Sequence, residues 1–434
     1  MKKTFKIVAL LLLVLVTSTF VFAQSSNTFT ATAETLRDDA DNFMNVRYYN
    51  DVDFSNFFAW TDLSLDEANL GFAKKFDALY LGAYYNGDLW DGSSDKTTTE
   101  NTTNVTKNIT GNHTFDLIFG FSGMAFKLGT YFNLDNTKTS YVDTENEYES
   151  ESKTNNSTYT FGLTWGGLSV PAGNANLRPW AKIAFDIDDA TVYSEVKTGD
   201  TTVVTTDKTN TNNLNTLSVT LASDAEWGSK DAFFSVAGLA YTLETAIGAN
   251  GVVYEVTDGE NTSTVTRYDF KHALNTFSPY YRFEYKVSDN LKLGGRVGAS
   301  LNITTGCPGD TYIDENKPED TPRFVKTTKT KIDPNLGLGM QYKLKPNFAM
   351  NLGLEASLPS FESTKTVTPV GEDSESKNVV SDVNSSFSSN LYTGFVWDIN
   401  ENCALDAYMS IPLNPSILMD ILGGGLSLGF KYKM

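Results

Sequence analysis

The chain has 434 residues, a formal net charge of −19 at pH 7, 28 phenylalanines, 21 tyrosines and 2 cysteines. A strongly acidic chain without a basic patch is not a nucleic-acid binder. The cysteines, Cys307 and Cys403, lie far apart in the sequence and cannot staple so long a chain, which excludes a disulfide scaffold.

The N-terminus, residues 1–23, predicts a secretory signal peptide. Lysines at the start are followed by an apolar run at 7–16 and by small residues up to a cleavage point after Ala23. The alternative is an uncleaved membrane anchor, but the apolar run is shorter than the roughly 20 residues that a spanning helix needs. An exported chain with so few cysteines suits a bacterial envelope.

Two further segments follow the leader. Residues 24–42 (QSSNTFTATAETLRDDADN) are polar, and we expect either a disordered stretch or a short helix inside the domain that follows. Residues 43–434 are expected to be that domain, because no change of composition marks a linker within them.

From residue 43 onward, short runs alternate apolar and polar residues, which is the pattern of strands with one apolar face. The runs come in pairs with tight joints, as in FDLIFGF-SG-MAFKLGTYFNL at 115–134. Ser-Asp-Asn at 288–290 and Lys-Pro-Asn at 345–347 are turn sequences, so each pair predicts a hairpin. The runs predict about sixteen strands, with fourteen as the alternative. We expect them near 43–55, 67–75, 78–86, 112–121, 124–134, 158–167, 177–187, 214–225, 231–242, 270–287, 291–303, 330–344, 348–358, 386–398, 402–411 and 421–434.

Short and long joints alternate along the chain. The long joints are rich in Thr, Asn, Ser and acidic residues, as in KTTTENTTNVTKNIT at 96–110. Outer-membrane barrels have short periplasmic turns and long outer loops, and aromatic residues near their strand ends. The alternatives are a soluble β-sandwich or a β-helix, neither of which needs all its long loops at one end. The long joints are expected at 87–111, 135–157, 188–213, 247–267, 304–328 and 359–385.

In this pattern, and in its last strand with Phe430 and Tyr432, the chain resembles a bacterial outer-membrane β-barrel protein of the porin type. The last residue is Met434, where that class usually has Phe. The resemblance implies an all-β fold: a closed antiparallel transmembrane barrel in the bacterial outer membrane. It also implies outer-membrane lipid and the barrel-assembly machinery as partners.

If the apolar alternates face lipid, the other alternates line a lumen. A three-residue turn at 288–290 places Arg282 opposite Arg296 and Lys286 opposite Lys292, and like charges so placed are unfavourable unless water or anions screen them. This predicts a hydrated pore for passive diffusion of small hydrophilic solutes, with a mild anion preference as a further reading. The alternative is a plugged barrel whose charges pair with each other. The candidate lumen residues are Lys127, Lys182, Arg282, Glu284, Lys286, Lys292, Arg296, Glu355 and Asp406.

The acidic outer joints support a second hypothesis, a non-conducting surface barrel that acts in adhesion or envelope structure. DTENEYESE at 143–151 is read either as a cation-binding surface or as a solvated, self-repelling loop, and the second reading is favoured. A homo-oligomer is left open. No apolar track follows the lumen positions, which disfavours a transporter of hydrophobic substrates.

The sequence offers no catalytic, cofactor-binding or metal-binding residues. Of the 2 histidines, His113 lies three residues from Asp116, and His272 lies three from Asp269, on opposite faces of a strand. No nucleophile motif, zinc cluster or nucleotide-binding loop accompanies them. We therefore expect a protein that is not an enzyme.

Overall fold

The structure is a computed structural model. All of its described secondary-structure elements are strands. The described residues contain no helix that is long and apolar enough to cross a bilayer. Residues 1–23, which are expected to be a signal peptide, and His272 lie outside the described part. The structure describes residues 32–36, 46–48, 57–64, 67–77, 79–88, 91–99, 101–121, 123–198, 201–207, 215–246, 252–258, 261–267, 273–306, 311–312, 323–324, 326–370, 374–384, 387–400, 403–413 and 426–433.

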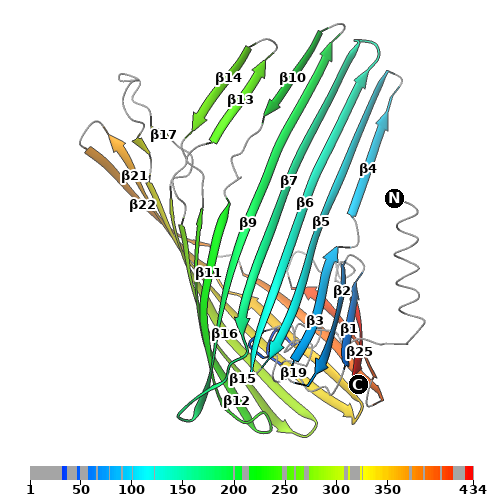
Figure 1. Cartoon of the computed structure of the whole chain (residues 1–434), viewed down its shortest axis with the longest axis vertical. Coiled ribbons are helices and arrows are strands. Elements are labelled where there is room, and N and C mark those ends of the chain that lie inside the picture. The colour runs from blue at the N-terminus through cyan, green and yellow to red at the C-terminus, as the bar shows by residue number, and fades with distance from the viewer. Residues whose placement is uncertain are drawn as a thin grey trace.

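A large antiparallel sheet contains most of the strands (Figure 1). Its strands are β1 (Phe57–Ser64), β2 (Glu67–Phe76), β3 (Leu79–Asp88), β4 (Asp91–Thr98), β5 (Thr102–Phe121), β6 (Met124–Asp143), β7 (Tyr148–Gly166), β8 (Val170–Ala172), β9 (Ala175–Thr198), β10 (Thr201–Asp207), β11 (Thr216–Gly228), β12 (Phe233–Ala246), β15 (Ala273–Ser288), β16 (Leu291–Gly306), β19 (Lys326–Lys345), β20 (Phe348–Ser357), β21 (Ser360–Val370), β22 (Ser374–Asn384), β23 (Ser388–Asn400), β24 (Cys403–Pro412) and β25 (Leu426–Lys433). Two small hairpin sheets pair β13 (Val252–Asp258) with β14 (Asn261–Arg267), and β17 (Thr311–Tyr312) with β18 (Arg323–Phe324).

The long strands pair in chain order: β1, β2, β3, β5, β6, β7, β9, β11, β12, β15, β16, β19, β20, β23, β24 and β25. The last of them also pairs with the first, with Phe58 opposite Lys433 and Ser64 opposite Ser427. Each of these strands therefore has a partner on both sides, so none leaves a fully unpaired edge.

The strand positions follow the expected runs except at the start. The continuous strand expected at 43–55 is wrong, because its described residues, 46–48, form a turn, and the first strand in the described part of the chain is β1 at 57–64. The sequence FFAWTDLS begins with a continuous apolar run, which hides the two-residue alternation that marked the other strands.

The expected long loops are also largely wrong, because strands continue through them. Residues 135–157 form the outer part of the β6–β7 hairpin, with a turn at 144–147, and β5 begins at Thr102. Thr and Val favour strands, and they can pair across neighbouring strands, so a polar stretch rich in them can extend a hairpin. An ion pair of 2.9 Å between Lys138 Nζ and Glu151 Oε2 joins these two strands. We call the outer parts of β5, β6, β7 and β9, together with β4 and β10, the projecting sheet; it extends toward the top of Figure 1, where β13 and β14 also lie.

The two faces of the large sheet differ in chemistry. Leu221 and Leu239 on one face are 58% and 53% exposed, whereas Asp224 and Arg282 on the other are only 1% and 3% exposed. A water-soluble protein buries its apolar face instead. The exposed apolar face continues on other strands, with Phe72, Leu81, Leu117, Leu128, Phe161, Ile183, Val297, Leu338, Leu352 and Trp397.

Candidate functional site

The face opposite the exposed apolar side chains is called the polar face. Strand registers place all the candidate lumen residues on it, since directly paired residues share a face. Arg282 pairs with Arg296 and Lys286 with Lys292, as the turn at 288–290 predicted. From Arg296 the register continues through Gly337 to Glu355. The set on this face is Lys127, Lys182, Arg282, Glu284, Lys286, Lys292, Arg296, Glu355 and Asp406.

Part of this charge is paired within the wall. Lys127 Nζ lies 2.8 Å from Asp116 Oδ2, and Arg282 pairs with Glu284 on the same strand. Glu355 accepts a hydrogen bond of 3.0 Å from the Tyr392 hydroxyl. The polar face is therefore a mixed-charge surface in which acids and bases compensate one another locally.

Two pieces of the chain before β1 lie against the polar face, and we call them the inserted segment: residues 32–36 and 46–48. Thr32 and Thr35 are 0% exposed, and Tyr48 is 2% exposed. A turn shapes the first piece, since the Thr35 amide and hydroxyl donate to the Thr32 carbonyl at 3.2 and 2.6 Å. The sequence left residues 24–42 as a disordered stretch or a short helix, and the five described ones form this turn.

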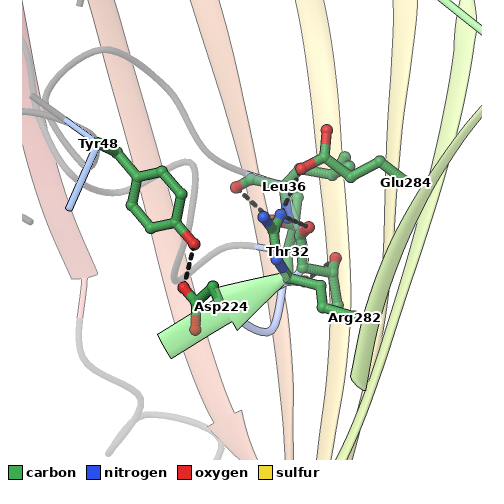
Figure 2. A network of polar contacts seen from close by, with 7 residues as sticks. Thr32, Leu36, Tyr48, Asp224, Arg282 and Glu284 are labelled. Carbon is green, nitrogen blue, oxygen red and sulfur yellow. Dashed lines mark hydrogen bonds and ion pairs between the residues drawn. The ribbon is translucent and has the colours of Figure 1, made fainter. Parts of the chain in front are cut away.

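The arginines of β15 and β16 hold the first piece. Arg282 Nη1 donates to the Thr35 carbonyl at 3.0 Å, and Figure 2 shows Arg282 between Glu284 and the turn of the segment. Arg296 forms an ion pair with the Glu34 carboxylate. The two arginines that face each other across β15 and β16 are thus both bound to one short turn.

Asp224 on β11 holds the second piece. It accepts hydrogen bonds from Arg47 Nη1 at 2.9 Å and from the Tyr48 hydroxyl (Figure 2). Arg178 on β9 donates to the Arg47 carbonyl at 3.2 Å and to the Glu226 carboxylate at 2.6 Å. Both acids are nearly inaccessible, so these contacts satisfy charges that are costly to bury alone.

Glycines in the wall make room for the inserted segment. A Cβ on Gly337 would lie 2.7 Å from the Ala33 carbonyl oxygen, and one on Gly294 would lie 2.6 Å from Thr35 Cβ. A Cβ on Gly339 would overlap the Thr35 hydroxyl and the Thr32 carbonyl, and one on Gly166 would lie 3.3 Å from the Val46 carbonyl carbon. Larger residues at these positions would displace the segment.

A polar cavity lies on the polar face, between β16, β19, β20 and the starts of β21 and β23. Its volume is about 400 Å³, and Lys331 and Asp333 form an ion pair of 2.8 Å in its lining. Asn335, two residues from Gly337 along β19, also lines it. The remaining lining residues are Ser300, Asn302, Pro334, Ser357, Leu358, Ser360 and Ser388.

His113 is not part of a catalytic pair with Asp116. Its Nδ1 lies 2.9 Å from the Tyr85 hydroxyl, and it pairs with Gly87 on the apolar face, whereas Asp116 is bound to Lys127 on the polar face. Within the ranges that the structure covers, no group of three or more His, Cys, Asp or Glu side chains is placed to hold a metal ion.

Sequence reasoning identified Arg282 and Arg296 but not their partners. Glu34 lies 262 residues from Arg296 in sequence, and Tyr48 lies 176 residues from Asp224, so no local spacing connects them. One signal was available: glycines at alternate positions in NLGLGM, 335–340, which mark a close backbone approach on one face.

Comparison with solved structures finds bacterial outer-membrane β-barrel proteins. The toluene transporter TodX of Pseudomonas putida is 11% identical, with 84% of this chain and 98% of that chain covered and a TM-score of 0.36. The deltaS2 mutant of the TodX monoaromatic hydrocarbon channel is 7% identical over 94% and 99%, with a TM-score of 0.38. CdiB from Acinetobacter baumannii is 11% identical over 88% of this chain, which spans 60% of CdiB, with a TM-score of 0.35.

At these scores the similarities assign neither a family nor a substrate to this chain. No family model matches the sequence. No curated protein matches it either.

Proposed function

We propose that this chain forms a closed, sixteen-stranded β-barrel in a bacterial outer membrane, after export directed by residues 1–23. The pairing of β25 with β1 is the observation that carries the proposal, since a barrel needs its last strand to bond its first. The exposed apolar face supports it, because only a closed ring of strands satisfies every backbone group while such a face meets lipid. Lipid and the barrel-assembly machinery are then its partners.

The proposed function is a channel for passive diffusion of small hydrophilic solutes. The polar face would line the lumen, and its mixed charge suits a hydrated path. A mild preference for anions would come from the basic stripe formed by Arg282, Lys286, Lys292 and Arg296. We propose a transport role rather than an enzymatic one, since His113 is bound to Tyr85 on the apolar face.

Planar-bilayer recording of the purified full-length protein tests the channel. Stepwise current increases in potassium chloride are expected, with a reversal potential in a salt gradient that is shifted modestly toward chloride. A membrane that stays silent at high protein load would reject the channel and leave a non-conducting barrel.

The projecting sheet supports a second candidate function, adhesion or envelope structure. Its strands are paired without interruption, as from Leu134 opposite Ser157 to Asp143 opposite Tyr148, so it is an ordered surface rather than a loose loop. Replacement of residues 136–155, which are paired at their ends as Asn136 with Asn155, by a two-residue Asn-Gly turn would shorten the β6–β7 hairpin without changing the register below. Loss of cell or matrix binding with unchanged conductance would favour adhesion as an additional role.

A further inference from the structure

The ion pair between Glu34 and Arg296 joins the inserted segment to the wall at a point that solvent reaches. The Arg296 side chain is 29% exposed and that of Glu34 is 45% exposed, whereas Thr32 and Thr35 beneath them are fully covered. A partly exposed ion pair contributes little net stability and exchanges readily with other charged groups. The carboxylate of Glu34 can therefore be replaced without unfolding the wall.

The wall at this point is organised to receive a carboxylate. Arg296 lies over the Tyr280 ring, with its guanidinium carbon 5.6 Å from the ring centroid, and directly opposite Arg282. A planar guanidinium binds a carboxylate through two parallel hydrogen bonds, which gives both strength and orientation. Arg282 is already bound to Glu284 and to the Thr35 carbonyl. Arg296 is therefore the arginine that can bind a solute carboxylate through two parallel hydrogen bonds, in place of Glu34.

Space for the rest of a solute lies two register positions along the same face, in a cavity that Arg296 and Glu34 do not themselves line. The cavity of about 400 Å³ is lined by hydroxyl and amide groups of Ser300, Asn335 and Ser357, among others. Asn335 pairs with Gly298, two positions from Arg296 on β16. A small hydroxylated molecule in this cavity would place an attached carboxylate near Arg296.

We propose that Arg296, with the adjoining polar cavity, binds the carboxylate group of a small hydrophilic solute, and that Glu34 is its intramolecular competitor. A solute carboxylate that replaces Glu34 leaves the local charge unchanged and frees the turn at 32–36 from one of its two arginine contacts. The site rests on the proposed channel only for the route by which the solute arrives. The proposal specifies small carboxylates as the substrate class of that channel. It also states that the substrate displaces the turn at 32–36.

Calorimetric titration of the full-length protein in detergent micelles tests the site, with gluconate as the probe and sorbitol, which lacks the carboxylate, as the matched control ligand. E34Q removes the competitor, so gluconate should bind E34Q about tenfold more tightly than wild type, a difference of about 1.4 kcal/mol. E34Q/R296Q should lose this gain, and sorbitol should show no difference among the variants. E151Q, which removes a carboxylate that pairs with Lys138 on the projecting sheet, should behave as wild type.

A second measurement keeps Arg296 intact, in case its replacement impairs folding. T35C, in a chain whose own two cysteines are replaced by alanine, reports the release of the segment through its rate of maleimide labelling, since Thr35 is fully covered. Saturating gluconate should raise this rate severalfold and sorbitol should not. Equal gluconate affinities for wild type and E34Q, or a labelling rate that gluconate does not change, would overturn the proposal.

These readouts separate the site from the channel. Binding in micelles with a silent bilayer would reject the channel and keep the site. A conducting protein whose E34Q variant gains no affinity for gluconate would keep the channel and reject the site.

Discussion

Ala59 of β1 and Tyr432 of β25 lie directly opposite each other on paired strands, although they are near the two ends of the chain. A seam of this kind is the last pairing that a sheet needs to become a ring. Its register is specified over seven residue pairs, from Phe58 with Lys433 to Ser64 with Ser427.

The seam predicts a specific disulfide. Directly opposed residues in an antiparallel pair have Cα atoms about 4.5–5.5 Å apart, which is within disulfide range. A59C/Y432C, in a chain without its native cysteines, should therefore oxidise under mild conditions to a circular species with altered mobility on non-reducing gels. A59C/L428C is the control, because four residues along a strand add about 13 Å. Free thiols in both variants would contradict the closed ring.

The apolar face predicts different tolerance of charge on the two sides of β12. L239R should destabilise the protein in lipid by about 2–4 kcal/mol if Leu239 faces the middle of the bilayer. A240R, at the next residue and on the polar face, should cost clearly less, since it meets water. Urea unfolding from lipid vesicles measures both, and equal costs would argue against a lipid-facing apolar surface.

The buried pair of Arg178 and Glu226 predicts a large effect of a single substitution. E226Q removes the charge that Arg178 Nε contacts at 2.6 Å, and breaking a buried pair in this way costs about 3–5 kcal/mol of unfolding free energy. R178M/E226L, which removes both charges, should recover most of the loss. The prediction fails if E226Q unfolds at the same urea concentration as wild type.

The contact between Gly339 and the inserted segment predicts that one added methyl group displaces the segment. The added Cβ of G339A would overlap the Thr35 hydroxyl, and overpacking of this kind costs about 1–3 kcal/mol. T35C labelling should therefore accelerate in G339A, and single-channel conductance should rise. G162A is the control on the same face, since its Cβ would meet Lys182 Cε at an ordinary 3.6 Å. Identical behaviour of the two variants would show that the segment does not depend on this contact.

The turn of the β6–β7 hairpin predicts a pH dependence at acid pH. Hydrogen bonds from Asn146 and Glu145 lower the pKa of Asp143 from its ordinary value of 3.8. A carboxyl group with a lowered pKa stabilises the folded turn fully above 3.8 and loses that contribution as the pH falls through the lowered pKa. The protection of the Glu145 and Asn146 amides from exchange, taken relative to an unfolded peptide at the same pH, should therefore be larger at pH 5 than at low pH. D143N should remove the pH dependence.

The sequence predicted the strands of the wall well, because alternation and turn residues are local signals. The pairing of Arg282 with Arg296 followed from one turn at 288–290. The polar composition of residues 135–157 predicts a loop, but they form strands, because Thr favours a strand once a neighbouring strand pairs with it. The inserted segment was beyond prediction, since it is held by ion pairs, carbonyl contacts and glycine gaps from distant strands, and none of these imposes a period on the sequence.

The unequal strand lengths have a consequence for what can reach the protein from outside. β5 and β6 have 20 residues each, whereas β24 has 10, so the β5–β6 side of the rim, the high side, extends about 30 Å further along its strands than the β24 side, the low side. If the barrel lies in an outer membrane, as proposed, the high side would be a screen that shields the lower part of the rim from large molecules outside the cell. Antibodies and neighbouring cells would meet that screen first, while small molecules would enter beneath it from the low side.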